Sequence, residues 1–169
     1  AFLEGWFASG DIGFLDEDGF LTITDRKKDI IKNSGGKIIA PQLIENSLKT
    51  SPFISNAIVI GDKKKYLSAL ITLDLAYISG SVKKYNLSGF NKVGTMSKHP
   101  EIIKLIDEEI KLKTAGFADY EQIRKFTILD NDFTIESGEI TPTLKVKRRF
   151  VEEKYKKVID EMYPTIWKQ

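Results

Sequence analysis

The 169-residue sequence contains no cysteine and a single histidine, His99. Without cysteine the chain cannot form a disulfide, a thiolate-ligated zinc or iron–sulfur site, or a thiol nucleophile. With one histidine, neither a histidine-rich metal site nor a Ser-His-Asp triad is expected. The sequence also lacks an apolar run of about 18 residues and a secretory signal pattern at its start. Because 41% of the residues are hydrophobic, a globular core is nevertheless expected.

Lysine and arginine are missing from residues 1–25, although the whole chain has 26 of them. Six acidic residues give this segment a net charge of −6, so the overall charge of +2 leaves +8 for residues 26–169. The sign changes between Asp25 and Arg26. Such an abrupt change predicts a boundary between two structural units. The chain also begins at Ala1 instead of methionine, and we expect it to be a fragment.

The hydrophobic pattern predicts an α+β fold with a small, mostly antiparallel sheet of about three core strands, packed with helices. An N-terminal hairpin is expected where Phe14–Leu15 and residues 20–24 flank the turn Asp16–Gly19. Helices are expected to begin at Pro41 and Pro100, where proline fits the first helical position. The other expected elements are strands at 29–32, 57–60, 67–73 and 126–129, a helical region at 76–120 with a stripe of Ile102, Ile103, Ile106 and Ile110, and a last helix with a stripe from Phe150 to Met162.

Three segments carry side chains that suit ligand binding. Asp11 follows Ser9 and Gly10, and a carboxylate can accept hydrogen bonds from both hydroxyls of a ribose, although aspartate after glycine is also a common turn residue. Residues 25–37, DRKKDIIKNSGGK, contain a glycine-rich loop between lysines, but neither GxxxxGK[ST] nor GxGxxG is present. Residues 145–149 place four cations beside a predicted helix start, where positive charge is unfavourable, and this mismatch favours anion binding.

Taken in order, three stretches resemble the C-terminal part of the adenylate-forming (AMP-binding) enzymes, and of long-chain fatty acyl-CoA synthetases in particular. They are residues 5–45, 51–74 and 138–155, and the versions SGGKIIAP and TPTLKVKRR carry the resemblance to the long-chain branch. The resemblance implies that residues 1–25 are the tail of a large N-terminal adenylation domain. Residues 26–169 would then be a mobile C-terminal domain with a helical insertion at about 76–120.

The resemblance also implies a role for individual residues. Asp11 would bind the ribose hydroxyls of ATP and of the adenylate, Arg26 would contact the nucleotide, and Lys28 would be the hinge. Lys145 would be the catalytic lysine, with Lys147 as the alternative, because TPTLK departs from the PKTxSGK that many members carry. The loop residues that would border the CoA channel are Ser34, Gly35 and Gly36, and no metal ligand is expected.

The activity that follows from this resemblance is an ATP-dependent long-chain fatty acid–CoA ligase. ATP and CoA would be substrates, and the ligands of Mg²⁺ would lie outside this chain, which alone is expected to be inactive. The expected partner is the N-terminal domain of the same protein, with no nucleic acid; the location is cytoplasmic, with peripheral membrane association left open. Two alternatives stay open: a fatty acyl-AMP ligase that loads a carrier protein, and a basic module that binds anions, nucleic acid or an anionic membrane.

Overall fold

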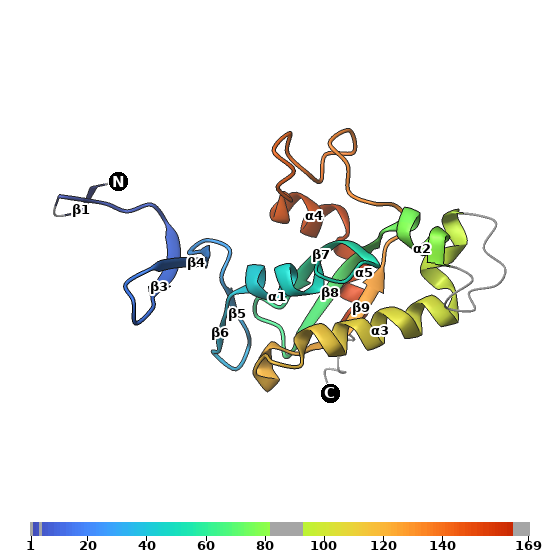
Figure 1. Ribbon diagram of the computed structural model, residues 1–169, viewed down its shortest axis with the longest axis horizontal. Helices are drawn as coiled ribbons and strands as arrows, with labels where there is room; N and C mark the ends of the chain where they lie inside the picture. The colour runs from blue at the N-terminus through green and yellow to red at the C-terminus, as the bar shows by residue number, and fades with distance from the viewer. Residues whose placement is uncertain (1, 4, 82–92, 164–169) are drawn as a thin grey trace, which may run out of the picture.

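The computed structural model describes residues 2–3, 5–81 and 93–163 of the chain. Figure 1 shows two parts: a string of small hairpins at the N-terminal end, and a body in which helices pack on a sheet. The hairpin strands are β1 (Phe2–Leu3), β2 (Trp6–Phe7), β3 (Asp11–Leu15) and β4 (Leu21–Arg26), paired β1 with β2 and β3 with β4 in antiparallel register.

The β3–β4 hairpin closes through the acidic turn that the sequence predicts. The Asp16 carboxylate accepts the backbone N–H groups of Asp18 at 3.1 Å and Phe20 at 2.8 Å. Gly19 has a φ of 83°, which a residue with a side chain seldom adopts, so glycine is required at this position. The predicted hairpin is therefore confirmed.

A three-stranded sheet forms the centre of the body. Its middle strand β8 (Leu67–Leu73) pairs antiparallel with β7 (Ile54–Ile60) and parallel with β9 (Ile123–Ile128). Every residue of β8 is buried, because it has a strand on either side and helices over both faces. Alternate side chains consequently enter different cores: Val59, Ala69 and Ile71 in one, Ile58, Ile60 and Leu70 in the other.

The first core is covered by α1 (Pro41–Leu48) and α3 (Pro100–Thr114), and the second by α4 (Arg148–Lys154) and α5 (Lys156–Met162). Ile44 and Leu48 of α1 are fully buried, and so are Ile102 and Ile106 of α3. The remaining elements are the strand pair β5 (Ile31–Lys32) and β6 (Ile38–Ile39), helix α2 (Leu75–Ser81), and the 3₁₀ helices η1 (Val93–Lys98) and η2 (Asp119–Glu121).

The α+β class is confirmed, as are the helix starts at Pro41 and Pro100 and the strand at 67–73. Several boundaries were wrong: strand 29–32 begins at Ile31, strand 57–60 begins at Ile54, and strand 126–129 runs over Ile123–Ile128. The last helix is interrupted at Tyr155, whose φ of −101° and ψ of 19° leave the helical range. Ile103 and Phe150 belong to the predicted apolar stripes but are 40% and 41% exposed. Of the predicted helical region 76–120, residues 82–92 lie outside the described residues.

Candidate functional site

The β3–β4 hairpin brings Asp11 and Arg26 together. The two residues are opposite one another in the strand register, and the Arg26 Nε lies 3.3 Å from an Asp11 carboxylate oxygen. Their side chains are 32% and 54% exposed, so solvent screens this ion pair and its contribution to stability is small. Both side chains can therefore exchange this contact for a ligand at low cost.

Lys28 lies in the turn that leads from β4 into the body. The Asp29 N–H donates to the Arg26 carbonyl at 2.9 Å, and the Lys27 N–H donates to the Gly10 carbonyl at 2.8 Å. Ser9 and Gly10 line an open pocket together with Arg26, Lys27 and Lys28. The predicted nucleotide-binding and hinge residues, Arg26 and Lys28, thus line one pocket, and the predicted ribose-binding residue Asp11 contacts Arg26 beside it.

The glycine-rich loop joins β5 to β6 and is exposed at Ser34, Gly35 and Gly36. The Asn33 side-chain oxygen accepts the Lys37 N–H at 2.9 Å and closes the base of the loop, and Gly36 has a φ of 78°. The Ser34 N–H donates to the Lys64 carbonyl at 2.9 Å, so the loop rests on the β7–β8 connection. An exposed loop with two glycines and a fixed base allows a ligand to approach the backbone closely.

Lys145 lies on a short hairpin, residues 139–147, which we call the lysine hairpin. The Thr141 N–H donates to the Lys145 carbonyl at 2.8 Å, and the Lys145 N–H donates to the Thr141 hydroxyl at 3.0 Å. Val146 bridges Ile140 and packs against the second core, so the neighbouring side chains of Lys145 and Lys147 project from the opposite side. Both lysines are exposed, and this geometry keeps both as candidates.

The loop that carries the lysine hairpin is fixed to the body at its start. The Asp132 carboxylate accepts the hydroxyls of Ser55 and Thr72, both at 2.5 Å, and the Asn56 amide at 2.9 Å. Burial opposes ionisation of this carboxyl, but these hydrogen bonds outweigh it and lower the pKa of Asp132. The first residues of the loop are therefore held against β7 and β8.

A second attachment lies at the base of the lysine hairpin itself. The Glu139 side chain is 1% exposed and accepts from the Lys154 ammonium at 2.5 Å, from the Tyr155 hydroxyl at 3.1 Å and from the Ser137 hydroxyl. Burial opposes ionisation of Glu139, but the hydrogen bonds from Lys154 and Ser137 prevail and lower its pKa to about 2. Burial and the Glu139 charge raise the pKa of Tyr155 to about 12, which keeps its hydroxyl a donor. The sequence interpretation did not single out Glu139, and no local signal distinguishes it from the nearby Glu136.

The four cations of residues 145–149 do not act as one patch. Arg148 is turned inward and pairs with Glu45 of α1, whereas Lys145, Lys147 and Arg149 are exposed. The predicted conflict between positive charge and the start of α4 is thus relieved at Arg148 by a carboxylate of the chain itself. Arg148 is therefore not available for the anion binding predicted for this run of cations.

Figure 1 places the β3–β4 hairpin to the left of the body, between it and the N-terminal β1, and the loop before α4 at the top, over the body. Asp11 and Arg26 thus belong to the β3–β4 hairpin, Lys28 to the turn that follows it, and Lys145 to the lysine hairpin. Among the described residues, no group of three or more His, Asp or Glu side chains is arranged to hold a metal ion. None of the helices described has the length and apolarity needed to span a membrane.

Sequence comparison defines the class of protein. The family described as the AMP-binding enzyme C-terminal domain matches residues 28–166, and the chain belongs to this family. The long-chain-fatty-acid–CoA ligase FadD15 of Mycobacterium tuberculosis is 45% identical over 163 residues, covering 96% of this chain and 27% of that protein. The human long-chain-fatty-acid–CoA ligase ACSBG1 is 38% identical over 177 residues, covering 95% of this chain and 24% of the relative. The chain thus spans about a quarter of the length of these relatives.

Solved structures confirm the fold. The A–PCP didomain of a carboxylic acid reductase from Segniliparus rugosus, in complex with AMP, matches 95% of this chain and 21% of its own with a TM-score of 0.76. The adenylation domain of a carboxylate reductase from Mycobacterium chelonae matches 95% of this chain and 23% of its own, also with a TM-score of 0.76. Both are 23% identical to this chain, so they support the architecture alone. The resemblance to AMP-binding enzymes stated from the sequence is confirmed.

Proposed function

We propose that the chain is the C-terminal part of an ATP-dependent long-chain fatty acid–CoA ligase. Such an enzyme converts a fatty acid, ATP and CoA into acyl-CoA, AMP and pyrophosphate through an acyl-adenylate. The names of relatives that are 45% and 38% identical over almost the whole chain support this reaction. The observation that carries the assignment of residues is the exposed Lys145 on a hairpin whose base is fixed by buried polar contacts.

The proposed role of Lys145 is electrostatic. When a carboxylate attacks the α-phosphate of ATP, negative charge accumulates between the two groups, and a fixed ammonium stabilises it. Lys145 suits this role because its backbone is held at both the N–H and the carbonyl while its side chain is free to reach a ligand. Because these hydrogen bonds already hold the Lys145 backbone in the hairpin, less entropy is lost when the transition state forms.

The proposed nucleotide site lies on the β3–β4 hairpin, where Asp11 would accept the ribose hydroxyls and Arg26 would contact the nucleotide. Lys145 belongs to the lysine hairpin and not to the β3–β4 hairpin, and we propose that the body rotates relative to the β3–β4 hairpin before adenylation. We place that rotation at Lys28, in the turn between β4 and the body. Residues 1–25 would then belong to the large adenylation domain, the partner of the mobile domain formed by residues 26–169.

The proposed second half-reaction uses the exposed loop of Ser34, Gly35 and Gly36. In this step the CoA thiol attacks the acyl carbon and AMP leaves. A loop without bulky side chains can border a narrow channel for the pantetheine arm, and its base on the β7–β8 connection keeps it in place. The ligands of Mg²⁺ are proposed to lie in the part of the enzyme outside this chain.

The test replaces Lys145 by alanine in the full-length protein that contains this chain, with Lys147→Ala as the matched control. Lys145→Ala is expected to slow ATP–pyrophosphate exchange by about 10² to 10³-fold, the effect of losing one fixed charge at the transition state. Transfer from a supplied acyl-adenylate to CoA should be largely retained, and Lys147→Ala should leave both half-reactions near normal.

Each other outcome has a definite meaning. A selective loss of exchange in Lys147→Ala would move the catalytic role to that residue. Equal loss of both half-reactions in Lys145→Ala would contradict the proposed role. AMP release that depends on an acyl carrier protein and not on CoA would identify the acyl-AMP ligase alternative.

A further inference from the structure

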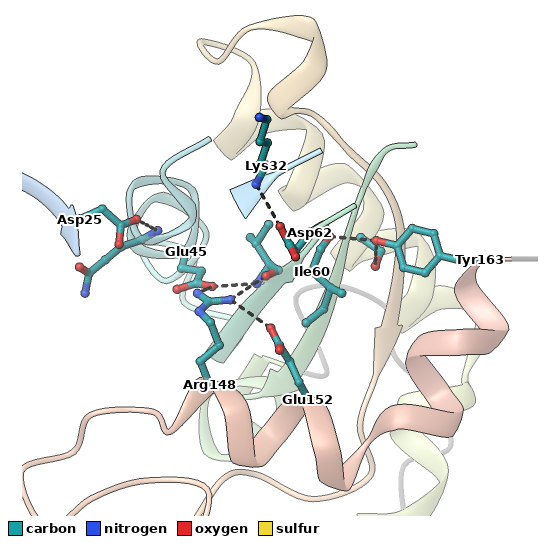
Figure 2. Close-up of polar contacts among 11 residues, drawn as sticks. Asp25, Lys32, Glu45, Ile60, Asp62, Arg148, Glu152 and Tyr163 are labelled. Carbon is teal, nitrogen blue, oxygen red and sulfur yellow. Dashed lines mark hydrogen bonds and ion pairs between the residues drawn. The ribbon is translucent and has the colours of Figure 1, made fainter. Parts of the chain in front are cut away.

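Arg148 and Glu45 form a largely buried ion pair between elements that are far apart in sequence. Their side chains are 17% and 14% exposed, and one guanidinium nitrogen of Arg148 donates to the Glu45 carboxylate. Another donates to the Val59 carbonyl at 2.7 Å, while the Val59 N–H donates to the same Glu45 carboxylate at 2.8 Å. Figure 2 shows this closed arrangement, in which α4 is attached to both α1 and β7.

The pair lies directly beside the lysine hairpin. Arg148 is the first residue of α4, and the preceding Lys147 donates its N–H to the Glu139 carbonyl at 2.7 Å, which closes the hairpin. Lys147 caps α4 without a side-chain hydrogen bond, so the start of the helix lacks the usual local support. The contacts of Arg148 supply that support and fix the direction in which the chain leaves the hairpin.

Stability alone is a weak explanation for this arrangement. Removing two charges from water is costly, and well-packed apolar residues often replace a buried ion pair with no loss of stability. The cost is visible at Glu45, where burial raises the pKa although Arg148 opposes the shift. What a guanidinium fork provides, and an apolar contact does not, is a fixed position set by directional hydrogen bonds.

We propose that Arg148 is a positioning residue for adenylation: held by Glu45 and the Val59 carbonyl, it fixes the start of α4 and thereby the orientation in which Lys145 is presented. Arg148 touches neither substrate nor reacting atoms, since its guanidinium is directed into the body. The inference rests on the proposed function of Lys145. It goes further by making α1 part of the scaffold of the adenylation site.

The experiment measures both half-reactions and the melting temperature of full-length Arg148→Lys, Glu45→Gln and the control Arg149→Lys. Arg148→Lys keeps the charge but loses the fork, and the exposed Arg149 next to it receives the same substitution. In Arg148→Lys we expect Lys145 to be displaced by about 1 Å, which should lower kcat for ATP–pyrophosphate exchange by about 10²-fold. The KM for ATP and transfer from supplied acyl-adenylate should change by less than about threefold, because neither depends on the orientation of Lys145.

The outcomes separate this inference from the proposed function. Equal losses in both half-reactions, in parallel with a lower melting temperature, would show a purely structural ion pair and overturn the inference. Normal exchange in Arg148→Lys, while Lys145→Ala is inactive, would also overturn it. Normal exchange in Lys145→Ala would instead overturn the proposed function. Should Arg148→Lys fail to fold, Glu45→Gln decides alone: without the charge that strengthens the hydrogen bond from Arg148, exchange is expected to fall while transfer from supplied acyl-adenylate is kept, and normal exchange would overturn the inference.

Discussion

The β3–β4 hairpin and the central strand β8 contain similar apolar side chains in opposite surroundings. Phe14, Phe20 and Ile23 of the hairpin region are 54–70% exposed, whereas Leu67 and Leu70 of β8 have no exposed surface. A two-stranded hairpin has no layer over its faces, while β8 has a strand on each side and helices above and below. Under the proposed function, the exposed face of the hairpin packs on the rest of the adenylation domain.

The acidic side chains of the two regions differ in the same way. Those of the turn Asp16–Asp18 are exposed, and Asp16 accepts hydrogen bonds only within the turn, whereas Glu139 is buried and connects the lysine hairpin to the helices that follow. Among the described acidic residues of the N-terminal part, Asp25 is the exception, since it is 2% exposed. The comparison therefore separates a body whose polar contacts hold distant segments together from hairpins whose contacts are mostly local.

The largest difference between the two regions is expected in the free energy of unfolding when an apolar side chain is replaced by alanine. Ile71→Ala in β8 should lower the free energy of unfolding by about 2–5 kcal/mol, because it leaves a cavity at a fully buried position. Ile23→Ala in β4, which is 54% exposed, should change it by less than about 0.5 kcal/mol. Urea unfolding of the 169-residue chain, followed by circular dichroism, measures both. Similar losses would show that the hairpin is packed as tightly as the sheet.

An intermediate effect is expected for Glu139→Gln. At pH 7 the substitution should cost about 1–3 kcal/mol, because Lys154 loses its buried charged acceptor. The pKa of Glu139 is lowered from 4.5 to about 2, so its contribution is complete above pH 4.5 and is lost as the pH falls from 4.5 towards 2. The stability difference between wild type and variant should shrink over that window.

The control for this prediction is Glu17→Gln, the same chemical change in the exposed turn of the hairpin. It should leave the free energy of unfolding within about 0.5 kcal/mol of the wild type at every pH. A difference at Glu139 that stays constant between pH 4.5 and pH 2 would contradict the ionised state assigned to its carboxyl.

The parts of the fold that could be predicted depend on signals within a few residues. The apolar run Leu67–Leu73 gave the buried strand, and Pro41 and Pro100 gave two helix starts, because proline suits the first helical position wherever the helix packs. The interruption at Tyr155 could not be predicted in this way. The apolar spacing continues through it, and its hydroxyl contacts Glu139, a residue of another segment.

The residues of the candidate site also divide into those with a local sequence signal and those that depend on contacts with distant segments. Asp11, Arg26, the glycine loop and Lys145 were selected because their local motifs resemble a family, and the structure shows Asp11 and Arg26 in contact. The Glu45–Arg148 pair was missed because 103 residues separate its members, and the cations around Arg148 predicted anion binding instead of an internal ion pair. A different contact of α1 did have a local sign. Ala40 precedes Pro41 and cannot cap the helix with its side chain, so the acceptor for the first backbone N–H groups of α1 had to come from another segment.

That acceptor is Asp25, the one point at which we expect a residue of the hairpin to matter to the body. Its carboxylate accepts the Gln42 N–H at 3.0 Å, in the first turn of α1, and the Arg26 N–H at 2.6 Å. Asp25→Ala should therefore cost about 1 kcal/mol, the usual effect of losing a helix cap, and should speed hydrogen exchange at the Gln42 amide. The control Asp18→Ala, in the exposed turn of the same hairpin, should leave that amide unchanged. If hydrogen exchange at the Gln42 amide is as fast in the wild type as in Asp25→Ala, the hairpin does not cap α1 in solution. The two regions are then as independent as the difference in their burial suggests.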